Sequence, residues 1–331
     1  MNTQHVVAYV VGADDWLVAE TRRAATGRAY RFLTEKSSAE EMSDALGAAR
    51  ALVAEPANAL ALRQACPDLR FIQFSTCDYP QSVLAELQSK GLQVASLGAA
   101  LAEDVAKTAI GLMIAVAECR KGLALGDPTA QAGQTSALNG KTVGIVGLGR
   151  VGTAIAGLLE RFNARVLYSD VRTAPQQLRH ALPLRRVTQD RLLVESDFVT
   201  LNVPLTDQSR GLLGRRDIGL IGPETVLVNT SAPEIVNRQS LVDALEGGYI
   251  KGYGAIDLDP GLAAHNNVVQ LGPQAVRTTA SAVRVARWIV DNADAAVAGR
   301  PVRGLVETIG FPKAGDPAFW SSRMTPREEL T

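Results

Sequence analysis

The sequence predicts an α/β fold made of two doubly wound parallel-sheet domains, and three observations support this. Short apolar runs rich in β-branched residues alternate with helical patterns along most of the chain, which is typical of βαβ units. The length of 331 residues suits two domains. A Gly-x-Gly-x-x-Gly motif directly follows one of the expected strands.

The first hundred residues predict a small open α/β sheet. Its strands are expected at His5–Val11, Tyr30–Thr34, Ala51–Ala54, Phe71–Ser75 and Gln93–Ala95. Its helices are expected at Asp15–Thr26, Ser38–Ala49 and Gln81–Lys90, and Gly91 follows the last of them in a C′ position.

A change of domain is expected after this sheet. A long apolar helix runs from Ala99 to about Leu125, and a polar connector with Gly and Pro follows it. The strands of a second sheet are expected at Lys141–Val146, Arg165–Ser169, Phe198–Val203, Thr225–Asn229, Gly254–Leu258 and Val268–Leu271. Their near-continuous apolar character favours a parallel sheet buried on both faces. A last helix is expected from Thr279 to about Ala298.

Composition and charge exclude several classes of function. The 34 Lys and Arg balance the 34 Asp and Glu, and the sequence pI is about 6.9, so no global field attracts nucleic acid. No segment has the pattern of a signal peptide or a membrane span. The three cysteines, Cys66, Cys77 and Cys119, do not form a disulfide framework or a zinc motif, and we expect a cytoplasmic protein without a metal.

The glycine motif predicts a dinucleotide site. Gly147 permits a tight turn, Gly149 lets the backbone approach a pyrophosphate, and Gly152 allows close packing of helix on strand. Arg150 and Val151 lie between them, at the N-terminus of the helix, where backbone N–H groups stabilise phosphate charge.

A carboxylate is expected at the ribose end of this dinucleotide. Asp170 ends the next strand, accepts hydrogen bonds from a ribose diol and repels a 2′-phosphate, so the expected cofactor is NAD rather than NADP. Arg172 either flanks the adenine or tolerates that phosphate.

With these residues in view, the chain resembles the D-isomer-specific 2-hydroxyacid dehydrogenases. The likeness rests on Gly147–Gly152 with Asp170, Asn202–Thr206, Val226–Ser231, Gly254–Asp257 and Ala298–Pro301. It implies a Rossmann NAD-binding domain at 102–282, inserted into a flavodoxin-like substrate domain made of 1–101 and 283–331. It also implies a cleft between the domains, a small-molecule substrate and a homodimer. Cofactor contacts are implied at Val203, Pro204, Thr230, Ser231 and Asp257.

The positions that carry the family's chemistry differ. The family's substrate-binding Arg corresponds to Ala232, its Glu to Leu262, and its acid/base His to Gln274. The methyl group of Ala232 cannot bind a carboxylate through two hydrogen bonds as a guanidinium does, and the amide of Gln274 cannot act as a titrating acid. Asp78 lies in the loop where the family presents glycine amides, and it would repel a 2-oxo carboxylate unless it is protonated or paired.

Replacement groups are therefore expected elsewhere. We take Lys107, Arg277 and Gln274 as the candidate catalytic residues, with a solvated Lys107 and a surface or phosphate-contacting Arg277 as the alternatives. Tyr79 is a proton donor or a packing residue, and His265 is either solvated or directed inward by its loop. Cys77 is a nucleophile only if its thiolate is favoured, which the adjacent Asp78 opposes.

The sequence thus predicts an NAD-dependent oxidoreductase that acts on an atypical substrate. Two alternatives remain: a catalytically silent NAD(H)-responsive binding protein, and a non-redox enzyme such as a lyase or epimerase that retains NAD.

Overall fold

The computed structural model describes residues 6–12, 16–118 and 138–307, and the chain divides into two compact units. The unit boundaries fall after Leu101 and after Val276, whereas the sequence predicted them after residues 101 and 282. The chain returns to the first unit earlier because α13 (Thr279–Val297) joins the core of that unit from its first turn, where Ser281 and Ala282 are buried. The part of the expected substrate domain from residue 308 onward lies outside the described residues.

The first unit is a five-stranded parallel sheet in the order β2-β1-β3-β4-β5. Its elements are β1 (Val6–Val10), α1 (Val18–Ala24), β2 (Tyr30–Leu33), α2 (Ala39–Gly47), β3 (Ala49–Ala54), α3 (Pro56–Gln64), β4 (Phe71–Phe74), α4 (Gln81–Ser89), β5 (Gln93–Ala95) and α13. This strand order is that of flavodoxin-like folds. Gly91 has a φ of +77°, as a glycine after a helix C-terminus requires.

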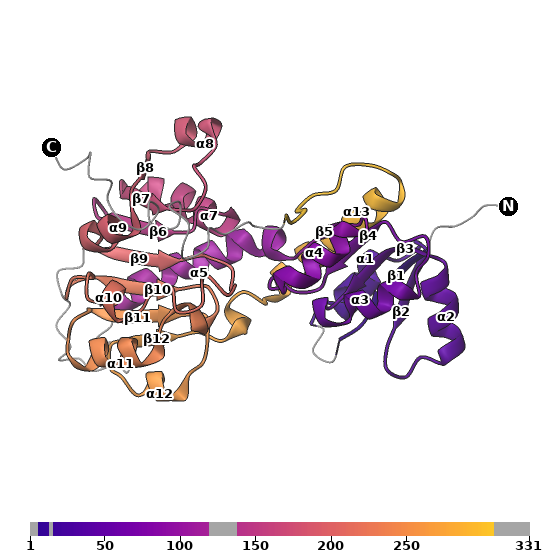
Figure 1. Cartoon of the computed structure of the whole chain (residues 1–331), viewed down its shortest axis with the longest axis horizontal. Coiled ribbons are helices and arrows are strands. Elements are labelled where there is room, and N and C mark those ends of the chain that lie inside the picture. Colours follow the sequence, from indigo (N-terminus) through magenta and orange to yellow (C-terminus); the bar gives the residue numbers. More distant parts are fainter. Residues whose placement is uncertain (1–5, 13–15, 119–137, 308–331) are drawn as a thin grey trace. The chain divides into compact units, whose positions relative to one another are not determined.

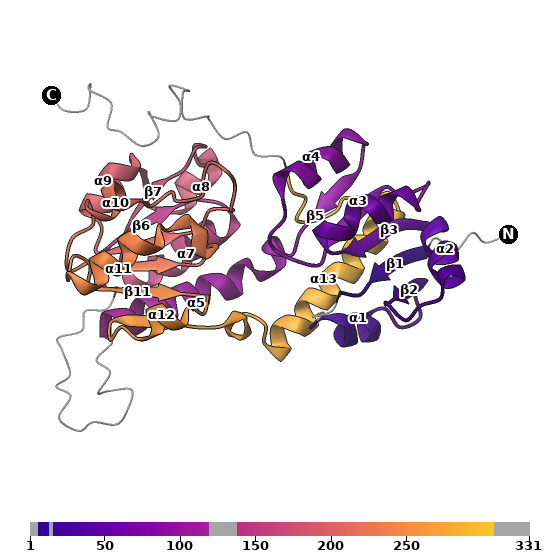
Figure 2. The same ribbon diagram turned by 60° about the horizontal axis from the view of Figure 1, so that its bottom comes forward.

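Helices cover both faces of this sheet. One apolar cluster joins α1 and α13 to the sheet through Leu17, Val285 and Ile289, although the two helices lie near opposite ends of the chain (Figure 2). The other cluster joins α2, α3 and α4 to the opposite face through Leu46, Ala59 and Leu84. The first unit is therefore a three-layer α/β/α domain.

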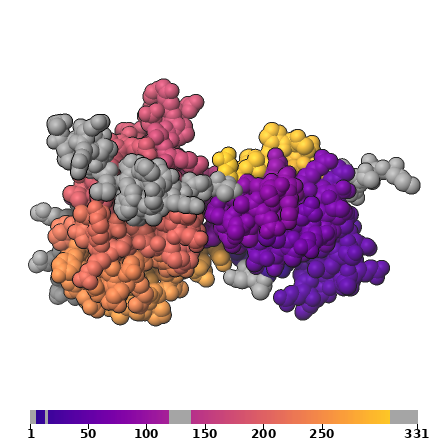
Figure 3. Space-filling model, in the orientation of Figure 1, coloured from indigo at the N-terminus to yellow at the C-terminus, as the bar shows by residue number. Residues whose placement is uncertain are grey.

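The second unit contains a seven-stranded parallel sheet. Its elements are α5 (Gly98–Glu118, whose first turn belongs to the first unit), β6 (Thr142–Val146), α7 (Arg150–Leu159), η1 (Glu160–Phe162), β7 (Arg165–Ser169), α8 (Gln176–Ala181), β8 (Leu184–Arg186), α9 (Gln189–Glu195), β9 (Phe198–Leu201), α10 (Arg215–Ile218), β10 (Val226–Asn229), η2 (Pro233–Ile235), α11 (Arg238–Glu246), β11 (Gly252–Ala255), α12 (Pro260–Ala263), β12 (Val268–Gln270) and η3 (Pro273–Ala275). The segment with α8, none of whose residues is buried, stands out from the surface of this unit (Figures 1 and 3).

The strand order of the second sheet is β12-β11-β10-β9-β6-β7-β8. Connections run outward in both directions from the pair β6 and β9, which makes this pair the topological switch point of a Rossmann sheet. In open parallel sheets ligands bind beyond the carboxyl ends of the strands at such a point. The fold therefore places a ligand site where the glycine motif follows β6.

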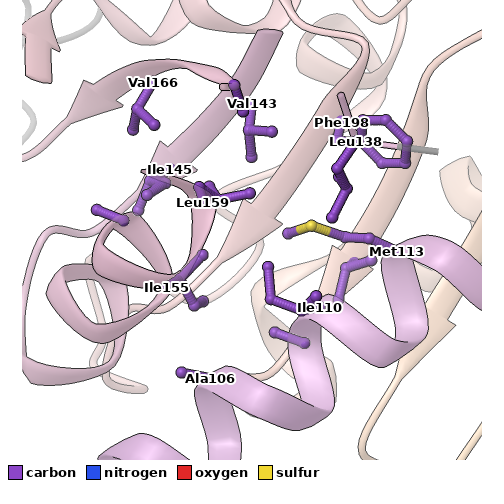
Figure 4. Close-up of a cluster of buried hydrophobic side chains, with 14 of the residues drawn as sticks. Ala106, Ile110, Met113, Leu138, Val143, Ile145, Ile155, Leu159, Val166 and Phe198 are labelled. Carbon is purple, nitrogen blue, oxygen red and sulfur yellow. The ribbon is translucent and has the colours of Figure 1, made fainter. Parts of the chain in front are cut away.

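Two apolar layers hold the second sheet between helices. Ala106, Ile110 and Met113 of α5 pack with α7 against one face (Figure 4). Helices α9, α10 and α11 cover the other face, where Leu192 and Leu241 are buried. Both faces of the sheet are thus covered, as its apolar strands predicted.

Strand β11 begins and ends earlier than the expected Gly254–Leu258. The glycines of this strand explain the difference, because they have no side chains and α5 lies directly against them. The apolar contacts of the strand therefore come from the side chains of the helix. A Cβ at Gly252 would lie 2.7 Å from Val116 Cγ1 and 2.4 Å from the Asn267 carbonyl oxygen. Asp257 consequently lies in the loop beyond the strand, at the carboxyl edge of the sheet.

We expect Gly252→Ala to lower the free energy of unfolding by about 1–3 kcal/mol, because the added methyl group overpacks this contact. Urea denaturation measures the change. Gly157→Ala is the control, because Gly157 lies inside α7 and a Cβ there meets no atom within 4 Å. A Gly252→Ala protein as stable as the unchanged chain would contradict this packing.

Candidate dinucleotide site and substrate end

The loop between β6 and α7 has the geometry of a dinucleotide cradle. Gly147 has a φ of +90°, and a Cβ on it would lie 2.6 Å from the Asn202 carbonyl oxygen. A Cβ on Gly152 would lie 2.2 Å from the Gly147 carbonyl oxygen. Glycine is therefore required at both positions by the turn and by close helix–strand packing.

Gly149 differs from its neighbours, because nothing in the protein itself requires glycine there. Its φ of −76° suits any residue, and a Cβ would meet no atom within 4 Å. No side chain caps the N-terminus of the ten-residue helix α7 that begins after it. Open space before uncapped helical N–H groups is what a pyrophosphate needs.

Asp170 connects β7 to the glycine loop. Its Oδ2 accepts a hydrogen bond from the Leu148 backbone N–H at 2.7 Å, and its Oδ1 accepts one from the Arg172 N–H at 2.8 Å. These bonds hold a half-buried carboxylate beside the cradle, where the ribose diol of a bound dinucleotide would donate hydrogen bonds. The Arg172 side chain is exposed.

Arg186 supports this loop and was missed by the sequence analysis. Its guanidinium donates to the Asp170 carbonyl oxygen at 2.9 Å and to Thr173 Oγ1 at 2.7 Å. The residue ends β8, a three-residue edge strand without an apolar run, so the sequence carried no signal for it.

The carboxyl ends of β9 and β10 are held together by short polar side chains. Ser231 Oγ accepts from the Val203 N–H at 2.9 Å, and Thr230 Oγ1 lies 2.8 Å from Asn202 Oδ1 and 3.0 Å from the Leu201 carbonyl oxygen. Pro204 follows with an exposed ring, and its carbonyl accepts from Ser209 Oγ at 2.6 Å. Val203, Pro204, Thr230 and Ser231 thus lie at one edge with the glycine loop.

The next two strands bring Asp257 and Gln274 to the same edge. Asp257 is half-buried beyond β11, and its Oδ1 accepts from the Leu258 N–H at 2.8 Å. Gln274 lies in η3 beyond β12. A Cβ on Gly272 would lie 2.7 Å from Gln274 Oε1 and 3.3 Å from Leu258 Cδ1, so the Gln274 and Leu258 side chains flank one glycine.

The comparisons identify the family. Residues 106–260 match the model described as D-isomer specific 2-hydroxyacid dehydrogenase, NAD binding domain. A glyoxylate reductase of Korarchaeum cryptofilum is 30% identical over 246 residues, which are 69% of this chain and 73% of that relative. The chain belongs to the D-isomer-specific 2-hydroxyacid dehydrogenase family.

Further members of this dehydrogenase family show how far the likeness extends. A glyoxylate reductase of Thermococcus litoralis is 30% identical over 207 residues, 58% of this chain and 61% of that enzyme's length. The match therefore spans less than two thirds of that relative. The solved structure of a glyoxylate reductase from Paecilomyes thermophila has a TM-score of 0.74 at 21% identity and covers 92% of this chain and 99% of its own. The similarity to this solved structure shows a shared fold alone.

The second unit of this 2-hydroxyacid dehydrogenase family member is an NAD-binding domain, and its residues fit the cofactor. The open space beside Gly149 would accommodate a pyrophosphate, the Asp170 carboxylate would face the adenosine ribose, and Thr230, Ser231 and Asp257 would lie towards the nicotinamide. The residues that would hold the cofactor thus come from the carboxyl ends of neighbouring strands.

Ala232 and Leu262, two of the positions at which the sequence is expected to differ from the family, have defined structural environments. Ala232 begins η2, and its carbonyl accepts from Asn229 Nδ2 at 3.2 Å. Leu262 is buried in the core of the second unit. Asp259, which follows the same strand, accepts hydrogen bonds from Arg238, which hold its pKa down at about 2 together with the Gly261 and Leu262 N–H groups. Asp259 therefore serves as a helix cap.

The candidate catalytic residues lie on both units. Lys107 and Gln274 are exposed on the second unit, with Lys107 next to the buried Ala106 on α5. Arg277 is exposed on the first unit, immediately before α13, and its guanidinium carbon lies 5.9 Å from the centre of the Trp16 ring.

His265 is not with these residues. It precedes β12, and its carbonyl accepts from the Val268 N–H, so it lies at the amino end of the strands. Asp257 and Gln274 lie at the carboxyl ends. Of the two alternatives for His265, the one in which the loop directs it inward is excluded, because the loop returns the chain to the opposite edge of the sheet.

The loop after β4 in the first unit contains Cys77, Asp78 and Tyr79. The Tyr79 ring packs against Phe74, with centroids 5.6 Å apart, which supports the packing interpretation. Burial and the neighbouring Asp78 raise the pKa of Cys77 to about 12, while the charge of Arg277 opposes the rise. Cys77 is therefore a poor nucleophile.

We expect iodoacetamide to alkylate Cys77 on the order of 10³-fold more slowly than a free thiol at about pH 8, because so little thiolate is present. Peptide mass spectrometry measures the extent of alkylation at Cys77 separately from the other cysteines. Asp78→Asn should speed the reaction, and Arg277→Gln should slow it, because the two charges act in opposite directions on the thiolate. Alkylation at the rate of a free thiol would refute this environment.

Among the residues that the structure describes, no helix is long and apolar enough to cross a membrane. No group of three or more His, Cys, Asp or Glu among them is arranged to hold a metal ion.

Proposed function

We propose that the protein is an NAD-dependent oxidoreductase with an altered substrate end, acting on a small molecule that is not a standard 2-hydroxy acid. One combination of observations carries this proposal. The cradle for the dinucleotide is complete from Gly147 to Asp257, whereas the strand ends beside it lack the groups with which the family binds and protonates a 2-oxo acid.

Each half of this combination has a physical meaning. Bound NAD supplies a two-electron reductant or oxidant at its nicotinamide. Ala232 cannot form the bidentate contact of a guanidinium with a carboxylate, and Gln274 donates hydrogen bonds without releasing a proton. Loss of a general acid costs roughly 10²–10⁴-fold in the rate of carbonyl reduction.

We assign substrate binding to Gln274, Lys107 and Arg277. Gln274 offers an amide at the strand edge that also holds Asp257. Lys107 and Arg277 are exposed cations that suit an anionic part of a substrate. Asp170 makes the preferred cofactor NAD, because its carboxylate repels a 2′-phosphate.

Assembly and location belong to the same proposal. The likeness to the family favours a homodimer formed by the NAD domains, and light scattering on the eluting protein measures its mass. The three cysteines, too few for a disulfide framework, favour the cytoplasm.

Calorimetric titration with NADH tests the cofactor half of the proposal. We expect one NADH per chain, and no binding would refute the proposed oxidoreductase. Mass spectrometry of the small molecules released by denaturation is the second measurement. An empty protein that then binds NADH reversibly is the expected result for an exchanging oxidoreductase.

A second function, an NAD(H)-responsive binding protein without turnover, is favoured by the neutral Gln274 at the position of the family's acid. It predicts NADH binding and no consumption of NADH with any carbonyl or imine. It further predicts that the set of proteins captured by the chain changes with the redox state of NAD.

A further inference from the structure

Charge is unevenly distributed along the NAD-binding unit. Residues 147–195, from the glycine loop through α9, contain eight arginines, no lysine and four carboxylates, so with neutral histidine they carry a net charge of +4. Residues 196–276, which follow in the same unit, contain five cationic side chains and nine carboxylates, a net charge of −4. The positive charge of this unit is therefore concentrated on the half that contains the cradle and Asp170.

A single segment at the surface carries much of this positive charge. Residues 171–189, which we call the basic segment, contain no carboxylate. Its arginines and its histidine are all exposed: Arg172, Arg179, His180, Arg185 and Arg186. The part with α8 stands out from the surface of the unit (Figures 1 and 3). The field of these guanidinium groups therefore extends into the solvent.

The carboxylates of the positive half do not neutralise the basic segment. Two of them form salt bridges with arginines outside it: Glu195 with Arg165 and Arg191, and Asp190 with Arg216. Asp170 accepts hydrogen bonds from backbone N–H groups, and Glu160 is exposed. Among the described residues, no carboxylate oxygen lies within 4.0 Å of the guanidinium nitrogens of Arg172, Arg179 or Arg185. These three charges therefore have no local counter-charge.

The basic segment borders the expected adenosine end of the cradle. It begins directly after Asp170, and Arg186 near its end returns to the same place, because its guanidinium donates to the Asp170 carbonyl oxygen at 2.9 Å. β8 also pairs with β7, with Arg186 opposite Tyr168. The pyrophosphate carries the negative charge of NADH, so the ligand expected in the cradle is an anion whose binding place adjoins this segment.

We propose that the basic segment attracts NADH from solution by its charge and so speeds the association of the cofactor with the cradle. This inference rests on the cofactor half of the proposed function and adds the rate at which that site fills. A charged surface of this kind raises the association rate constant of an oppositely charged ligand by roughly 10–10³-fold. The attraction reaches about 30 Å at 0.01 M salt and about 3 Å at 1 M. Salt therefore separates long-range attraction from direct contact.

Arg179 and Arg185 are the residues that distinguish attraction from contact with the bound cofactor. Arg186 supports the loop of Asp170, and Arg172 lies in that loop, so a substitution of either would also disturb the cradle. Arg179 lies in α8. The Arg185 side chain leaves β8 on the face opposite to that of Arg186, because successive side chains of a strand alternate. The charges of Arg179 and Arg185 thus act on NADH before it is bound.

Rapid mixing of the protein with NADH, followed through the fluorescence of the reduced nicotinamide, measures the association and dissociation rate constants. For the chain with both Arg179→Gln and Arg185→Gln, we expect association about fivefold slower than for the unchanged chain at about 10 mM salt. At about 0.5 M salt the two association rate constants should agree. The two proteins should have the same dissociation rate constant at each salt concentration, because neither side chain contacts bound NADH.

The chain with both Arg70→Gln and Arg300→Gln is the matched control. It loses the same charge from two exposed arginines of the first unit. Its association rate constant should stay within about 1.5-fold of that of the unchanged chain at every salt concentration. Thermal unfolding should show both variants to be as stable as the unchanged chain, because all four side chains are exposed.

Three results would overturn the inference. Equal slowing in the control would assign the effect to net charge, and faster dissociation of the Arg179→Gln, Arg185→Gln protein would make these residues contacts of the bound cofactor. Unchanged association at low salt is the third. In each case NADH still binds, and the cofactor half of the proposed function stands. A chain that binds no NADH would remove the proposed function itself.

Discussion

Replacing Gly149 by alanine is expected to raise the dissociation constant of NADH about 30-fold, roughly 2 kcal/mol, without changing the stability of the protein. The backbone at Gly149 is compatible with alanine, and the added Cβ meets no atom within 4 Å. The methyl group instead fills the space through which a pyrophosphate reaches the N-terminus of α7.

Calorimetry gives the dissociation constant, and thermal unfolding of the ligand-free protein gives the stability. Gly157→Ala in the same helix is the control, and its NADH affinity should equal that of the unchanged chain. A Gly149→Ala protein that binds NADH normally would show that the cofactor does not pass this glycine, and the assignment of the cradle would fail.

Asp170→Asn is expected to raise the affinity for NADPH relative to NADH about 100-fold. The substitution keeps the shape of the side chain and removes the charge that repels a 2′-phosphate. Arg172 is exposed nearby, and Arg186 donates to the Asp170 carbonyl oxygen, so two guanidinium groups remain close to the phosphate position.

Dissociation constants for both nucleotides, measured from the fluorescence of the reduced nicotinamide, provide the ratio. Asp207→Asn removes a carboxylate from a loop further along the same sheet edge and should leave the ratio unchanged. An unaltered ratio in Asp170→Asn would mean that another group sets the choice between NAD and NADP.

Much of the fold could be predicted because its signals are local. A buried parallel strand is an apolar run, and Arg165–Ser169 and Gln93–Ala95 were predicted with the bounds that the structure has. The Gly-x-Gly-x-x-Gly motif encodes its own strand, turn and helix, so the cradle and Asp170 followed from adjacent residues.

Elements whose stability comes from distant partners could not be predicted. Strand β8 is an edge strand of Leu-Arg-Arg, and β11 owes its burial to Leu112 and Val116 of α5 rather than to its own glycines. The chain re-enters the first unit at residue 277, because α13 packs against strands of that unit that precede it by about two hundred residues.

The residues proposed to lie near the substrate were harder to predict than the fold, for the same reason. Sequence reasoning found Asp257 and Gln274, which follow strands directly, but left two alternatives for His265, because the direction of a loop decides which edge of the sheet it reaches. The pairing of Asp259 with Arg238 and the role of Arg186 depend on contacts between separate elements. These contacts carry no signature in a single sequence.

The central claim is that a complete NAD site is joined to a substrate end in which the position of the family's acid holds Gln274, which cannot protonate a carbonyl. Rapid mixing of the preformed NADH complex with saturating glyoxylate, followed through the absorbance of the reduced nicotinamide, tests it most directly. The account predicts no loss of that absorbance beyond the rate without protein, in a sample whose NADH is shown by its fluorescence to be bound. Oxidation of the bound NADH at about 1 s⁻¹ or faster, as in an ordinary enzyme, would contradict it.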